Sequence, residues 1–212
     1  DAVVLSHSDT DHWSGLPALL EARPPRLLLV RRGALPAALR RVRGPRVIEL
    51  ASGWATLERS GARFTLLAPE VPDGASDNDR SLSLLLEVHG RSVLLCGDPQ
   101  EVGLLALRRA LPGLSPDLLL LPHHGLPGSG LEAFLAELEA GALLVSAGKA
   151  AAGRISLPES RARIERTYEG GAIEVEIDPD GALRTRRFSG RRRVSWRGPR
   201  RPCPGPSRRR AA

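Results

Sequence analysis

Short apolar runs recur along this chain, and most of them end at glycine, proline or aspartate. Such runs are typical of buried β-strands, and stretches with helical spacing of apolar residues separate several of them. This mixture predicts an α/β sandwich rather than a pure barrel or helix bundle. The expected strands are Ala2–Ser6, Arg26–Val30, Val47–Leu50, Arg63–Leu67, Leu82–Val88, Ser92–Cys96, Asp117–Leu121, Ala142–Ser146, Ala172–Ile177 and Leu183–Phe188. The expected helices are Leu16–Glu21, Pro36–Arg41, Gln100–Ala110, Leu131–Glu139 and Pro158–Tyr168.

The net charge of +7 is concentrated near the C-terminal end. Residues 181–212 contain 12 Arg and no Asp or Glu, which leaves 19 basic and 24 acidic residues in the first 180. The body is therefore mildly acidic, and its overall charge does not indicate a polyanion partner. Residues 190–212 are rich in Arg, Pro and Gly and are predicted to be a disordered tail, whereas residues 1–189 are expected to form one domain.

The composition also bounds the cellular context. No apolar run reaches the roughly 18 residues that a membrane-spanning helix needs, so no transmembrane segment is expected within this chain. Because the chain opens with Asp1 and a strand-like run, we expect it to be part of a larger protein. Cys96 and Cys203 do not form a disulfide framework, and they leave the redox compartment undecided.

The segment that follows the first expected strand carries the strongest chemical signal. In HSDTDHWSG, the side chains of His7, Asp9, Asp11 and His12 offer four possible metal ligands within six residues. Mixed imidazole and carboxylate donors suit ions such as Zn²⁺ or Mn²⁺. A helix cap accounts for one or two of these residues but not for both histidines. The segment therefore predicts a metal site.

Two further apolar runs end in possible ligands. Ser92–Cys96 is followed by Gly97 and Asp98, which is also ordinary turn chemistry. The run before Pro122 is followed by His123 and His124 at a strand end, where two adjacent imidazoles fit metal ligation as well as a structural role. His89 lies in the short VHGR segment and is predicted to be an exposed turn residue rather than a ligand.

The order of these motifs resembles the β-lactamase-like domain of the ComEC DNA-uptake family. The resemblance runs from Ala2 to about Gly181 and rests on HSDTDHWSG, SDNDRSLSLLLEV, SVLLCGD, LLLLPHHG and LLVSAG. It implies a four-layer αβ/βα metallo-β-lactamase-like sandwich with a two-metal site at the strand ends. It also implies a metal-dependent nuclease that degrades the DNA strand that is not imported, at the extracytoplasmic face of the bacterial inner membrane. The implied partners are single-stranded DNA and the membrane channel portion of the same protein.

The resemblance also implies roles for individual residues. His7 and Asp9 would bind one metal ion, Asp11 and His12 the second, and Asp98 would bridge them. One of His123 and His124 would complete the ligand set of the second metal ion, and the sequence does not choose between them. Asp11 can bind metal or orient the nucleophile as a proton acceptor. Asn78, or alternatively Asp79, stands where relatives place a ligand or a polar substrate contact.

Two departures from the family pattern concern substrate contacts. Leu126 replaces the usual serine after HHG, with Ser129 nearby as a substitute, and Leu157 replaces a histidine before Pro158. Three hypotheses therefore remain: a nuclease of a DNA-uptake channel, a stand-alone hydrolase of a small ester, lactam or phosphodiester, and a non-catalytic accessory domain of the channel. A stand-alone nucleic-acid-binding module fits less well, because only 3% of residues are aromatic.

Overall fold

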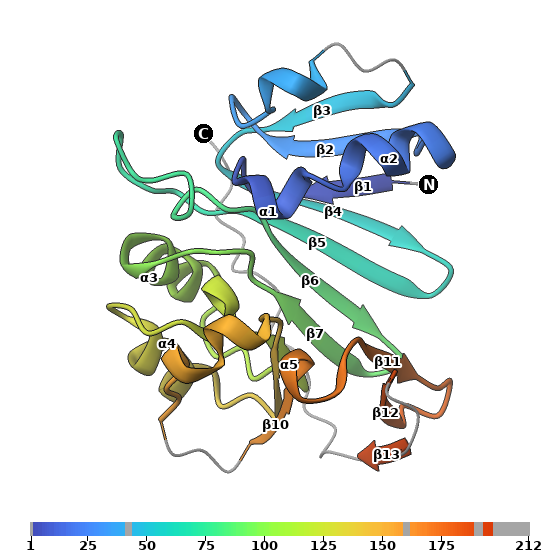
Figure 1. The fold of residues 1–212 in the computed structure, drawn as a ribbon, viewed down its shortest axis with the longest axis vertical. Coiled ribbons are helices and arrows are strands. Elements are labelled where there is room, and N and C mark those ends of the chain that lie inside the picture. The colour runs from blue at the N-terminus through green and yellow to red at the C-terminus, as the bar shows by residue number, and fades with distance from the viewer. Residues whose placement is uncertain (1, 41–43, 159–161, 189–192, 197–212) are drawn as a thin grey trace.

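The computed structural model describes residues 2–40, 44–158, 162–188 and 193–196, without side chains for the last four. Three sheets organise this part of the chain. The first is a parallel sheet at one end of the molecule, with α1 (Thr10–Trp13) and α2 (Leu16–Ala22) beside it (Figure 1). Its strands are β1 (Ala2–Leu5), β2 (Leu27–Arg31) and β3 (Arg46–Leu50).

The central sheet has seven strands in the order β10-β9-β8-β7-β6-β5-β4. Pairing is antiparallel from β4 to β7 and parallel from β7 to β10. The parallel half matters for function because the carboxyl ends of β7, β8 and β9 meet at one edge. The strands are β4 (Gly53–Arg59), β5 (Ala62–Ala68), β6 (Ser83–Val88), β7 (Arg91–Leu95), β8 (Leu118–Leu120), β9 (Ala142–Val145) and β10 (Arg163–Arg166).

Helices cover one face of the central sheet. The buried faces of α3 (Glu101–Ala110) and α4 (Leu131–Leu138) pack on β5 to β9 around Phe134, which is fully buried. The opposite face packs against an antiparallel sheet of β11 (Ile173–Ile177), β12 (Leu183–Arg187) and β13 (Arg193–Trp196). The expected α/β sandwich is confirmed by this arrangement of a mixed sheet flanked by helices.

The structure differs from the sequence-based elements at the C-terminal side. The predicted helix Pro158–Tyr168 is wrong, because Arg163–Arg166 form strand β10 and only Thr167–Gly170 form a helical turn, α5. Arg193–Trp196, within the segment predicted to be a disordered tail, form strand β13. The rest of the predicted tail, residues 190–192 and 197–212, lies outside the described residues.

Two differences lie nearer the N-terminus. Strand β4 was not expected, since every residue in it is exposed and it lacks a buried alternating face. Strand β4 forms because it pairs with the antiparallel strand β5. The turn at Ser60 and Gly61, with φ of 52° and 76°, joins the two strands. The predicted helix Pro36–Arg41 is reduced to a 3₁₀ turn over Ala37–Leu39. Within the residues that the structure describes, no helix is long and apolar enough to cross a membrane.

Candidate metal centre

Possible metal ligands follow three strands and meet at one place in the fold. His7 follows β1, Asp98 follows β7, and His124 lies in the turn Pro122–Gly125 that follows β8. The end of β1 is joined to the central sheet by a hydrogen bond from Leu82 N to Ser6 O of 2.8 Å. Segments separated by more than 80 residues in the chain are thereby brought together.

The ligand atoms form two sets of three that share one histidine. His7, His12 and Asp98 form the first set, and Asp11, His12 and His124 form the second. Within each set the candidate ligand atoms lie within 4.8 Å of one another. Asp98 lies between the sets, with its two oxygens 3.3 Å from His12 Nε2 and 3.4 Å from His124 Nε2. This arrangement suits a carboxylate that bridges two cations.

The two innermost imidazoles present unsatisfied nitrogens to this site. Nε2 of His7 and Nε2 of His12 are buried, and neither makes a hydrogen bond within the described part of the chain. Their Nδ1 atoms lie 3.1 and 3.2 Å from the Ser6 hydroxyl. A hydroxyl oxygen can accept two N–H donors, which leaves both Nε2 lone pairs free for a cation. Buried polar atoms normally have partners, so these two fit a metal ion.

Burial and neighbouring charges shift the pKa values of His7, His12 and Asp98 in different directions. Burial and the neighbouring His12 lower the pKa of His7, which favours its neutral, ligating form. Interaction with the Asp98 carboxylate raises the pKa of His12 despite burial. Burial raises the pKa of Asp98, but the imidazoles of His12, His124 and His7 outweigh it and hold that pKa below its usual value. Asp98 therefore stays ionised and electrostatically paired.

The structure brings His124, and not His123, into the centre. His124 Nδ1 donates to Ser146 O at 2.8 Å, which turns Nε2 toward Asp11 at 3.2 Å. The His123 ring centroid lies 6.4 Å from that of His124, and its Nδ1 lies 3.4 Å from Gln100 Nε2. Both histidines have left-handed backbone angles, with φ of 48° and 58°, a strained arrangement that often accompanies function.

The remaining predicted site residues are Asp9, Asn78 and Ser129. The Asp9 carboxylate is 3.5 Å from His7 Nε2 and half exposed, so it borders the first set. Asn78 has a buried Oδ1 with no hydrogen bond among the described residues, and Ser129 is exposed beside His123 and Gln100. His89 is exposed between β6 and β7 with φ of 51°, as its predicted turn role requires.

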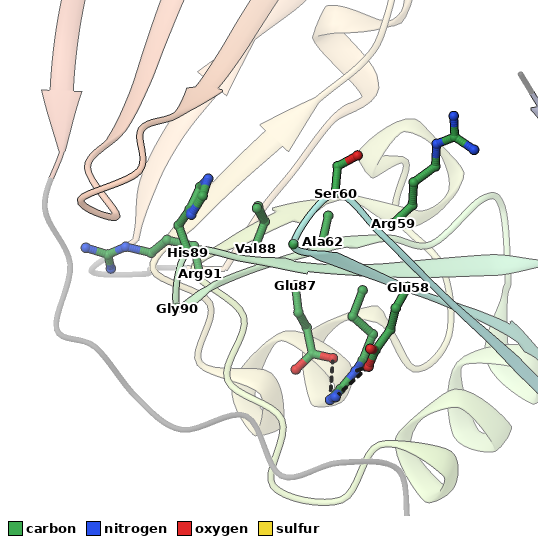
Figure 2. Close-up of a pocket in the computed structure, with 11 residues that line it drawn as sticks. Glu58, Arg59, Ser60, Ala62, Glu87, Val88, His89, Gly90 and Arg91 are labelled. Carbon is green, nitrogen blue, oxygen red and sulfur yellow. Dashed lines mark hydrogen bonds and ion pairs between the residues drawn. The ribbon is translucent and has the colours of Figure 1, made fainter.

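A depression of about 550 Å³ lies at the opposite end of β6 and β7. The turns that join β4 to β5 and β6 to β7 form it, and none of the predicted site residues lines it (Figure 2). The acidic groups in it are engaged, because Arg63 contacts Glu58 at 2.9 Å and Glu87 at 3.9 Å. This depression is therefore separate from the metal centre.

Comparison with known families agrees with the geometry of the centre. Residues 1–149 match the family model described as "Metallo-beta-lactamase superfamily". The chain belongs to the metallo-β-lactamase superfamily. Members of this superfamily are generally metal-dependent hydrolases and typically bind divalent cations such as zinc, in agreement with the unsatisfied imidazole nitrogens described above.

Two curated relatives refine this assignment. The chain is 34% identical over 158 residues to ComE operon protein 3 of Bacillus subtilis, covering 70% of this chain and 20% of that protein. It is 27% identical over 149 residues to Recombination protein 2 of Haemophilus influenzae, covering 70% of this chain and 18% of that protein. The resemblance to the ComEC-type domain is confirmed, and the chain spans about one fifth of the length of these relatives.

A solved structure supports the superfamily fold. CmlA β-hydroxylase, studied as its E377D mutant, matches with a TM-score of 0.50 and 16% identity over 68% of this chain and 36% of that one. At this level of identity the match concerns the fold alone.

Sequence reasoning missed the residues that orient the ligands of this metallo-β-lactamase domain. Ser6 contacts both Nδ1 atoms, Ser81 Oγ accepts from Asp98 N at 3.1 Å, and Ser146 O fixes His124. Ser6 directly precedes the motif HSDTDHWSG, and Ser81 is the last residue of SDNDRS. Their places beside candidate ligands could have indicated an orienting role. Ser146 acts through its backbone, so no side-chain pattern identifies it.

Replacing Ser6 with alanine is expected to weaken divalent-metal affinity by about 10- to 100-fold, because both imidazoles lose the group that orients them. Metal titration followed by calorimetry measures this. Ser14→Ala, an exposed serine in the same segment, is the matched control and should bind as the wild type does. Equal affinity of the Ser6 and Ser14 variants would show that the hydroxyl does not orient the ligands.

Proposed function

We propose that this domain is a metal-dependent phosphodiesterase that degrades single-stranded DNA in a ComEC-type DNA-uptake protein. The observation that carries the proposal is the pair of buried Nε2 atoms of His7 and His12, which make no hydrogen bond within the described residues and lie beside the Asp98 carboxylate. The first ion would be held by His7, Asp9 and Asp98, because the one free lone pair of His12 can serve a single ion. The second would be held by Asp11, His12 and His124, with Asp98 shared. We propose Zn²⁺ or Mn²⁺ from this mixture of donors.

The chemistry follows from the placement of the carboxylates. When bound, two divalent ions supply hydroxide at neutral pH and positive charge for an in-line phosphoryl displacement. Asp98 is 7% exposed and central, so its role is to hold and shield the positive charge. Asp11 is 66% exposed and lies 3.2 Å from His124 Nε2, at the rim where substrate arrives. It can therefore accept the proton of the attacking nucleophile as well as bind metal.

The accessibility of the centre favours a polymeric substrate over an enclosed small molecule. Asp11, His124 and Asp9 all reach solvent, whereas His7 and Asp98 are buried beneath them. Leu157 stands where the family pattern has a histidine, and its side chain has no titratable proton to give to a leaving group. It packs against the main hydrophobic core instead. Protonation of the leaving oxygen then falls to groups at the exposed rim or to water.

Basic residues stand on the segment that follows β9. Lys149 and Arg154 lie on the 3₁₀ turn Lys149–Arg154, close in sequence to Ser146, which contacts His124. Both side chains are exposed, and neither forms a salt bridge within the described residues. We propose that they contact the phosphates of the bound strand on its way to the metal centre.

Replacing Lys149 and Arg154 together with alanine is expected to weaken single-stranded DNA binding and to flatten its salt dependence. Each lost phosphate contact should reduce the slope of log K against log salt by about 0.7. Fluorescence anisotropy at several salt concentrations measures the slope. Arg46→Ala, an exposed arginine at the amino end of β3, is the control. An unchanged slope in the double variant would remove these two residues from the DNA path.

The cellular setting is proposed from the same relatives. We propose that the domain works beside the membrane channel portion of the same protein, at the extracytoplasmic face of the bacterial inner membrane. It would degrade the strand that is not imported during natural transformation.

The purified protein, supplied with Mn²⁺ or Zn²⁺, should degrade end-labelled single-stranded DNA and hydrolyse bis(p-nitrophenyl) phosphate, and EDTA should stop both reactions. A p-nitrophenyl ester and a chromogenic β-lactam serve as comparison substrates. Turnover of the ester or lactam without turnover of phosphodiesters would support a small-molecule hydrolase instead. Metal binding without turnover of any of these would indicate a non-catalytic accessory domain.

A further inference from the structure

We propose that Asp79 is a positioning residue for the metal centre, acting through the loop of residues 76–82 that holds two ligand-bearing segments in place. This inference rests on the proposed metal centre and extends it to residues that touch no metal. Its basis is a buried carboxylate that accepts hydrogen bonds from the start of α3 and from Ser76 in its own loop.

Asp79 caps α3 from outside the helix. Its side chain is largely buried, and Oδ1 accepts hydrogen bonds from Gln100 N at 3.0 Å and Gly103 N at 2.8 Å. Oδ2 accepts from Ser76 Oγ at 2.9 Å. The N-cap residue of α3, Gln100, makes no capping hydrogen bond through its own side chain. Asp79 therefore satisfies N–H groups at the start of α3 that otherwise have no partner, and its negative charge suits a helix N-terminus.

The backbone of the loop packs closely against the first turn of α3. A Cβ placed on Gly103 would lie 2.6 Å from Asp79 O and 2.9 Å from Asp79 Cα, both backbone atoms. A Cβ on Gly97 would lie 3.0 Å from the Cβ atoms of both Ser6 and Ser81. These contacts fix the distance between the loop, the first turn of α3 and the segment that carries Asp98.

The same loop reaches the ligand segments directly. Asp98 N donates to Ser81 Oγ at 3.1 Å. Two residues further along the chain, Gln100 N donates to the Asp79 carboxylate. Leu82 N donates to Ser6 O at 2.8 Å, beside His7. Ser8 Oγ also donates to Asp77 at the other end of the loop. The loop thus joins the segment of His7 to the segment of Asp98, and the Asp79 carboxylate anchors it to α3.

Asp79 is a positioning residue because its carboxylate contacts none of the proposed ligands. Loss of its hydrogen bonds would free residues 97–100, and with them Asp98, which both cations are proposed to share. Outer groups that orient ligands commonly contribute 10- to 100-fold to metal affinity. An effect of that size is therefore expected from Asp79, although it makes no bond to the metal.

Titration of the purified protein with Co²⁺, followed by its visible absorption, tests this because the spectrum reports the ligand geometry. Asp79→Ala should weaken Co²⁺ affinity by about 10- to 100-fold and alter the spectrum. Asp79→Asn keeps an oxygen that accepts from Gln100 N and Gly103 N, and should bind within about threefold of the wild type, since the cap geometry is retained.

Asp117→Ala is the matched control for a general loss of stability. The Asp117 carboxylate accepts from Ser92 N at 2.8 Å and from Arg91 Nη1 at 2.8 Å at the other end of β7. It should lower the unfolding temperature and leave Co²⁺ affinity and spectrum unchanged. If Asp79→Ala does not fold, Ser81→Ala, which removes the acceptor of Asp98 N, should shift the spectrum in its place.

Wild-type spectrum and affinity in both Asp79→Ala and Ser81→Ala would overturn the positioning role, as would an equal loss in Asp117→Ala. A wild-type protein that binds no Co²⁺ would overturn the metal centre itself. The first two results leave the proposed function intact, so the two failures are distinguishable.

Discussion

Substituting His12 with alanine is expected to abolish phosphodiester hydrolysis and to lower divalent-metal affinity by more than about 100-fold. His12 Nε2 lies in both candidate ligand sets, 3.3 Å from Asp98 and 3.7 Å from Asp11, and its one free lone pair is assigned to the second ion. Outer groups alone change metal affinity by about 10- to 100-fold, so loss of a direct ligand should cost more. The second ion would keep only Asp11, His124 and the shared Asp98.

The metal-free protein should tolerate this substitution. The two groups that His12 contacts most closely keep other partners, because Ser6 Oγ lies 3.1 Å from His7 Nδ1 and Asp98 lies 3.4 Å from His124 Nε2. Differential scanning fluorimetry with and without metal separates the two effects. Metal at about 100 times its Kd stabilises a folded protein by roughly 2.7 kcal/mol, and the variant should lose that increment.

His89→Asn serves as the matched histidine control, because Asn tolerates the positive φ of 51° at this exposed turn. It should retain metal binding and activity. Metal-dependent hydrolysis that survives in His12→Ala would contradict the proposed centre.

Truncating Phe134 to alanine is expected to lower the free energy of unfolding by about 3–5 kcal/mol. The ring is 0% exposed and lies in the main core, between α4 and the strands of the central sheet. Its loss removes buried apolar surface and leaves a cavity beneath the strands that carry the metal centre. Urea unfolding should show a lower midpoint with an unchanged slope.

Leu105→Ala is the comparison for Phe134, because the Leu105 side chain on α3 is 42% exposed. It should change stability by no more than about 0.5 kcal/mol, as surface substitutions usually do. A cost below about 1 kcal/mol for Phe134→Ala would show that the helices do not form the main support of the sheet.

Local patterns in the sequence indicated much of this domain. The apolar runs that form β1, β7 and β8 each precede a candidate ligand. The sequence alone therefore predicts that His7, Asp98 and the 123/124 pair follow strand ends. The sequence does not predict that His124 rather than His123 enters the centre. That choice depends on the backbone turn and on Ser146 O, 22 residues further along the chain.

Other features depended on contacts that no local pattern contains. Arg163–Arg166 resembled part of a helix, yet it pairs with β9 and buries Glu165 against Arg187 at 2.7 Å. Strand β4 lacks apolar alternation and depends on β5. Asp79 was considered as a ligand or substrate contact, whereas its carboxylate caps α3. In each case tertiary pairing outweighed the local preference.

Elemental analysis of the purified protein, compared with His12→Ala prepared in parallel, tests the central claim most directly. The proposed centre predicts up to two divalent ions per wild-type chain and a clear loss in the variant. Equal metal content in the two proteins, or none in the wild type, would contradict a cation site built from His7, Asp11, His12, Asp98 and His124.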